Sequence, residues 1–70
     1  MRNSSSIWDE TPRIGELCWC EVLQGIKYPG IVIDVYGFDY WNPQTKHEWI
    51  YIVWTNGHII FAKGSKVEKM

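Results

Sequence analysis

The chain has 70 residues, of which 46% are hydrophobic and 16% aromatic, and its formal net charge is -1. So short a chain can build only one hydrophobic core, which excludes a multi-domain protein. The near-zero charge gives no long-range field that attracts phosphate, so bulk electrostatic binding to nucleic acid or anionic membranes is disfavoured. The longest apolar runs, such as residues 49–54, are far shorter than the ~20 residues of a membrane-spanning helix.

Residues 1–12 contain three consecutive serines, one Ile-Trp pair and a proline, without a repeating apolar period. They predict a flexible N-terminal tail, followed by one domain over residues 13–70. No apolar run of signal-peptide length follows the start, so we expect a cytoplasmic protein. The two cysteines, Cys18 and Cys20, would lie roughly 6.5–7 Å apart on a strand, too far for comfortable bridging. We therefore expect two reduced thiols.

Five segments of high β-propensity follow one another, separated by Gly, Pro and Asn turn signals: 17–23, 31–36, 48–54, 58–62 and 66–68. The intervening residues 37–47 have the composition of a loop and yet contain Phe38, Tyr40 and Trp41. Asn56-Gly57 favours a two-residue turn with positive φ angles, so the third and fourth segments should form an antiparallel hairpin. No segment has the 3.6-residue apolar period of a helix.

Five short strands in 70 residues suit a small curled barrel, which protects its edges better than a flat sheet does. The sequence therefore predicts an all-β fold, a single five-stranded SH3-like barrel. The side chains expected in its core are Leu17, Cys20, Val22, Val32, Val35, Ile50, Ile52, Ile60 and Val67.

Three runs, at 14–20, 28–32 and 52–57, resemble Tudor and PWWP domains, which are SH3-like barrels. The resemblance covers roughly residues 14–69. It implies an aromatic cage for methylated Lys or Arg, with Tyr28 and Trp54 at cage positions, Asn56 near the polar contributor and Val22 at the first-strand aromatic position. The same plan, with its short Ser-x-Val-Glu end, also resembles small SH3-like proteins encoded by tailed bacteriophages. That resemblance implies a location in the host cytoplasm and no known activity.

Four side chains are candidate zinc ligands: Cys18, Cys20, His47 and His58. Their spacing lacks the Cys-x(2–4)-Cys pair and the matching second pair that are typical of structural zinc sites. A cysteine nucleophile activated by His58 would need a third group to hold the base and an oxyanion site, and no motif supplies either. We expect no metal, no cofactor and no enzymatic activity.

The chain has five Trp and four Tyr, and so small a core cannot enclose them all, since each would bury ~150–250 Å². Some rings should therefore form an exposed apolar patch, which usually marks a binding site. The sequence predicts a non-catalytic module that binds a protein or peptide partner. The predicted contact residues are Tyr28, Tyr36, Tyr40, Trp41, Trp54 and Asn56.

Two other functions stay open from the sequence. A nucleic-acid-binding barrel of the KOW type would stack bases on these rings and contact phosphate through Lys46, Lys63, Lys66 and Lys69. Acidic residues near the aromatic loop would repel phosphate. A virion or assembly component would pack edge to edge with copies of itself or with a larger shell protein. Salt-dependent retention on DNA would identify the first function, and concentration-dependent size the second.

Overall fold

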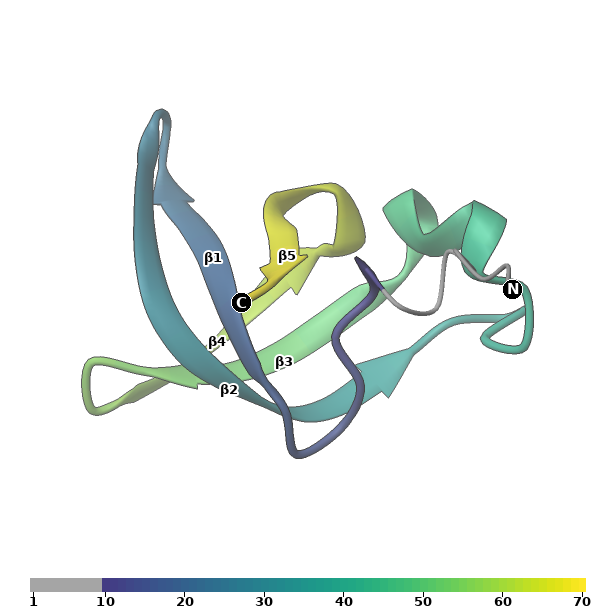
Figure 1. The fold of residues 1–70 in the computed structure, drawn as a ribbon, viewed down its shortest axis with the longest axis horizontal. Coiled ribbons are helices and arrows are strands. Elements are labelled where there is room, and N and C mark those ends of the chain that lie inside the picture. Colours follow the sequence, from purple (N-terminus) through teal and green to yellow (C-terminus); the bar gives the residue numbers. More distant parts are fainter. Residues whose placement is uncertain (1–9) are drawn as a thin grey trace, which may run out of the picture.

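A computed structural model describes residues 10–70 of the chain (Figure 1). Its elements in chain order are β1 (Leu17–Leu23), β2 (Ile26–Tyr36), η2 (Pro43–Glu48), β3 (Ile50–Thr55), β4 (His58–Lys63), η3 (Gly64–Lys66) and β5 (Val67–Lys69), where η denotes a 3-10 helix. Of the predicted tail 1–12, residues 1–9 lie outside the described residues, and Thr11 and Pro12 are buried.

The strands form one antiparallel sheet in the order β4-β3-β2-β1-β5. The 11-residue strand β2 pairs with β1 along its first part and with β3 along its second, and it is strongly curved (Figure 1). Strands β4 and β5 do not pair, so the sheet stays open between them. The all-β prediction is confirmed, and the five antiparallel strands are compatible with an SH3-like fold.

Strand β2 begins at Ile26, five residues before the predicted start, and it runs through Pro29. Proline is tolerated in a strand where its nitrogen faces no ladder partner. Pro29 lies opposite Trp19 on β1, whereas pairing with β3 begins only at Ile31. The prediction that residues 26–30 lie between the first two strands was therefore wrong.

A β-bulge in β2 sets which of its residues face the interior. Val32 pairs with Val53, but the next pair joins Asp34 to Ile52, so Ile33 is an extra residue on β2. The extra residue shifts the alternation by one position. As a result Val32 and Val35, three residues apart, are both buried.

Among residues 10–70, the hydrophobic core contains eight buried side chains: Cys18, Cys20, Val32, Val35, Trp49, Tyr51, Val53 and Val67. The prediction was right for Cys20, Val32, Val35 and Val67, and Ile60 packs against this cluster. It was wrong for Leu17 and Val22, which are exposed, and for the two isoleucines of β3, Ile50 and Ile52, which are only half-buried.

The inward face of β3 is the opposite of the predicted one. Because side chains alternate along a strand, the burial of Trp49, Tyr51 and Val53 turns both isoleucines outward. The face with Trp49 and Tyr51 buries more surface than the isoleucine face would, and the polar groups of both rings form hydrogen bonds. The Tyr51 hydroxyl donates to the Pro12 carbonyl at 3.2 Å, and the Trp49 indole N–H donates to Asp39 at 3.3 Å.

Substitutions in the β3–β4 turn test the register of the hairpin. Asn56 and Gly57 have φ angles of 52° and 82°, as the Asn-Gly signal predicted. Replacing both by alanine places two Cβ-bearing residues in left-handed conformations, so the free energy of unfolding should fall by roughly 1–3 kcal/mol. Urea denaturation measures this change, with Asn56→Gly as a control that keeps the turn accessible. A double alanine variant as stable as the wild type would contradict the register.

Candidate functional site

The outward side of the sheet carries an apolar row that crosses four strands. Leu17 pairs with Ile31, Ile31 with Trp54, and Trp54 with Ile59. Their exposed fractions are 54%, 36%, 48% and 59% in that order. Neighbouring strands lie ~4.8 Å apart, so the row spans roughly 15 Å of surface. The solvated face of an antiparallel sheet is commonly polar, and this row across it is not.

Residues on either side of the row extend this surface. Ile52 pairs with Phe61, which is 69% exposed, and the bulge places Ile33 beside them. On the other side, Trp19 lies opposite Pro29 and is also exposed. We call this surface the outer apolar face; it comprises Leu17, Trp19, Ile31, Ile33, Ile52, Trp54, Ile59 and Phe61.

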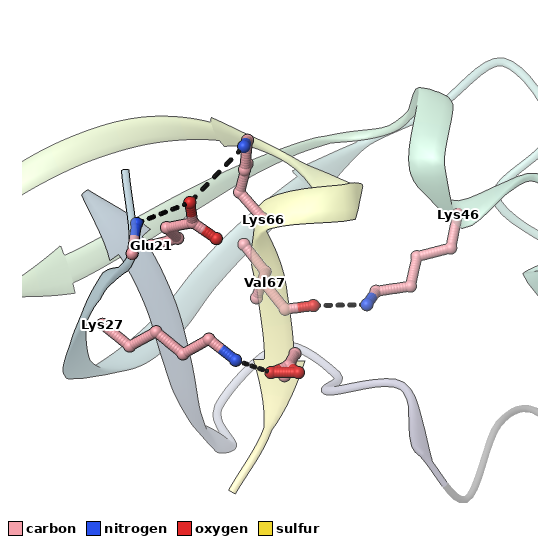
Figure 2. A network of polar contacts seen from close by, with 7 residues as sticks. Glu21, Lys27, Lys46, Lys66 and Val67 are labelled. Carbon is pink, nitrogen blue, oxygen red and sulfur yellow. Dashed lines mark hydrogen bonds and ion pairs between the residues drawn. The ribbon is translucent and has the colours of Figure 1, made fainter. Parts of the chain in front are cut away.

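A set of ion pairs borders the outer apolar face where β1, β2 and β5 meet (Figure 2). Lys27 pairs with Glu68, and Lys66 Nζ lies 3.6 Å from Glu21 Oε2. The backbone N–H of Gly25 also donates to Glu21, and together with Lys66 it lowers the pKa of that carboxyl. The hydrogen bond to Glu68 raises the pKa of Lys27. Opposite charges thus compensate one another at this border.

A pocket of about 160 Å³ lies beside the β3–β4 turn, lined by Val22, Tyr28, Thr55, Asn56, His58 and Ile60. Its volume suits a single side chain, since a cavity of ~150 Å³ accommodates benzene. Three positions that the Tudor resemblance implies for the cage, Val22, Tyr28 and Asn56, line this pocket. The fourth, Trp54, is on the outer apolar face. The pocket therefore lacks the several aromatic faces that surround a methylated cation.

The six predicted contact residues occupy four different places. Tyr28 and Asn56 line the pocket, while Trp54 and Tyr36 share the outward side of the sheet, two cross-strand rows apart. Trp41 is in the loop before η2 with its ring centroid 6.2 Å from that of Phe38. Tyr40 turns inward and stacks edge-on against Trp49, with ring centroids 4.9 Å apart.

The sequence interpretation missed most of the outer apolar face. Leu17 was expected inside, and Phe61 was not among the predicted contact residues. Both are exposed because their strand neighbours Cys18 and Ile60 take the inward positions. Apolar residues occupy both faces of β1 and β4, so alternation alone carried no signal that could have found this surface.

The two thiols and one lysine lie toward the interior. Burial, reinforced by Cys20, raises the pKa of Cys18 to about 11, and both cysteines are free and buried. Such thiols stay protonated at neutral pH and are poor nucleophiles. Lys46 reaches in from η2, and its ammonium donates to the Val67 carbonyl (Figure 2). It also lies 6.0 Å from the Tyr51 ring centroid. Burial lowers the pKa of Lys46.

Compared with known proteins, the chain matches no family model, no curated protein and no solved structure. The resemblances to Tudor and PWWP domains and to bacteriophage proteins therefore stay predictions. Within residues 10–70 there is no group of three or more His, Cys, Asp or Glu side chains arranged to hold a metal ion. The same part of the chain contains no helix that is long and apolar enough to cross a membrane.

Two tryptophans with opposite environments provide a stability test. Trp41 is 73% exposed and Trp49 is fully buried. Trp41→Ala should leave the melting temperature nearly unchanged. Trp49→Ala should remove about 3–5 kcal/mol of stability, enough to unfold a domain of this size. Thermal melting followed by circular dichroism measures both, and a large drop for Trp41→Ala would mean that its ring covers the core.

The raised pKa of Cys18 predicts a pH dependence of stability. Between pH 9.0, the ordinary pKa, and about 11, the unfolded chain releases the Cys18 proton while the folded chain keeps it. The free energy of unfolding should therefore fall as pH rises through this window, by at most about 1.4 kcal/mol per pH unit from this group.

The lowered pKa of Lys46 acts in the opposite direction, so the wild type is compared with Cys18→Ala, which retains the lysine. The stability difference between the two proteins, measured by urea denaturation from about pH 8 to about pH 10.5, should narrow as pH rises. A constant difference would contradict the assignment to Cys18.

Proposed function

We propose that the protein is a non-catalytic interaction module with an SH3-like fold, which binds a protein or peptide partner through the outer apolar face. The observation that carries this proposal is the row of four exposed apolar side chains across β1 to β4. The strong curvature of β2 and the return of β5 beside β1 support the SH3-like assignment.

Trp54 has the position of a binding anchor. It lies inside the row, between Ile31 and Ile59, so the other contacts of a partner bound along the row would surround it. Binding hot spots are enriched in Trp and cluster near the centre of an interface, surrounded by contacts that exclude water. Half of the Trp54 side chain is already supported by the sheet, so its ring can present a preformed surface to the partner.

The lysines of the chain favour a protein partner over nucleic acid. Lys66 and Lys69 have carboxylate partners in Glu21 and Glu16, and Lys46 donates its ammonium to a backbone carbonyl. Among the described residues, Lys63 is the only one of the four lysines considered for phosphate binding that takes part in none of these contacts. Phosphate contacts dominate nucleic-acid affinity, and this surface offers few cations for them.

A peptide library displayed on phage tests the proposal. We expect selection against the immobilised protein to yield peptides rich in apolar side chains. Trp54→Ala should weaken their binding at least about tenfold, because the anchor is removed. Trp41→Ala is the matched control: it removes an equally large, exposed ring away from the outer apolar face and should change binding less than about twofold. Circular dichroism establishes that both variants fold.

Two outcomes would contradict the proposal. One is that no peptide survives selection. The other is that Trp54→Ala leaves binding intact while Trp41→Ala abolishes it, which would move the contact to the loop between β2 and η2.

A further inference from the structure

Strand β4 is an unprotected edge of the sheet. It has six residues, it pairs only with β3 among the described residues, and it carries neither charge nor proline from Ile59 to Ala62. Edge strands are usually blunted by charges, prolines, bulges or short length, because their free peptide groups invite another strand. The opposite edge, β5, fits that rule: it has three residues, two of which are Glu68 and Lys69.

The register of the hairpin identifies which peptide groups of β4 face outward from the edge. In an antiparallel ladder, hydrogen-bonded and non-bonded pairs alternate, and the pair that flanks a two-residue turn is bonded. Here that pair is Thr55 and His58, and the hydrogen bond from the Gly64 N–H to the Trp49 carbonyl, 2.8 Å, falls on the same alternation. The peptide groups of Ile59 and Phe61 therefore point away from β3.

We propose that a second copy of the chain pairs with this edge, β4 against β4, antiparallel and about a two-fold axis at Ile60. This inference goes beyond the proposed function, because the contact lies at the edge of the sheet and not on the outer apolar face. In this register Ile59 faces Phe61 of the second copy, and Phe61 faces Ile59 of the second copy. Both positions have outward peptide groups, so each of these two pairs exchanges two backbone hydrogen bonds. The outer apolar faces then join into one surface across both copies.

The side chains of β4 favour this register over a shift by one residue and over a shift by two toward Phe61. A shift by one residue would turn the apolar faces of the two copies to opposite sides of the joined sheet. A shift by two, with the axis at Phe61, would set Ile59 opposite Lys63 of the second copy. With the axis at Ile60, the interface contains two Ile–Phe contacts of the aromatic–β-branched kind that stabilises sheets, and Lys63 lies opposite Gly57 of the second copy. The edge is thus complementary to itself, as a two-fold interface requires.

The size of the contact sets its strength. One pair of edge strands, with Ile59 and Phe61 as the main exposed side chains, buries less than the ~800 Å² per partner of a standard interface. The dimer therefore belongs to the weak class, monomeric at low micromolar concentration and increasingly dimeric toward millimolar concentration.

Sedimentation equilibrium of the full chain tests the pairing. From roughly 10 μM to roughly 1 mM, the average mass of the wild type should rise from that of a monomer toward twice that value. Phe61→Lys adds the kind of charge that protects natural edges, and it should keep the protein monomeric over the whole range. If Phe61→Lys does not fold, Ile59→Lys makes the same change at the other exposed edge position.

Trp54→Lys is the matched control. It makes the same apolar-to-cation change on the outer apolar face, but on β3, and it should still dimerise. A wild type that stays monomeric at 1 mM, or a Phe61→Lys variant that associates like the wild type, overturns the proposal. If Phe61→Lys and Trp54→Lys are both monomeric, the contact is on the outer apolar face and the edge pairing is wrong.

A monomeric wild type that binds the selected peptides overturns this inference alone. Dimerisation without peptide binding overturns the interaction-module proposal alone.

Discussion

The described chain has one interior, on one side of one sheet, and alternation along each strand lets only every second residue reach it. Eight side chains form that core, whereas 46% of the chain is hydrophobic. The remaining apolar residues must lie elsewhere, and the pairing register collects many of them on the outward side, in rows such as Leu17–Ile31–Trp54–Ile59. The outer apolar face thus follows from the same alternation that builds the core. A chain selected only for solubility would carry polar residues at these positions at little expense to its fold.

The small interior is filled by large rings, and it brings segments that are distant in the sequence into close contact. Trp49 holds the loop after β2: Tyr40 stacks on it, Asp39 accepts its indole N–H, and a Cβ at Gly37 would come within 2.5 Å of its ring. The Thr45 hydroxyl and this indole lower the pKa of Asp39, so the carboxylate stays charged as an acceptor. The two 3-10 helices also meet closely, since a Cβ at Gly64 would overlap the Lys46 carbonyl oxygen. These contacts hold the loop and η2 to the sheet.

The sequence predicted those features that depend on local chemistry. Turn residues placed the β3–β4 hairpin, and β-branched runs placed the strands, so the all-β fold and buried residues such as Val32 and Val67 could be found. Which face of β3 is buried could not, because Trp49, Tyr51 and Val53 alternate with isoleucines that are just as apolar. The choice depends on partners far away in the chain, among them the Pro12 carbonyl that receives the Tyr51 hydroxyl. Trp54 was a predicted contact residue, but its neighbours in the row come from three other strands and are defined only by the register.

The two edges of the sheet explain why association of such a surface need not lead to aggregation. On the β5 side, Glu68 and Lys69 are engaged with Lys27 and Glu16, so another strand would have to displace these ion pairs before it could pair there. On the β4 side no charge stands between Ile59 and Ala62. A copy with two open edges would add strands without limit, because each addition would leave a new edge exposed. A copy with one open edge uses it in the first two-fold contact, and the joined sheet then ends in a protected β5 strand on both sides.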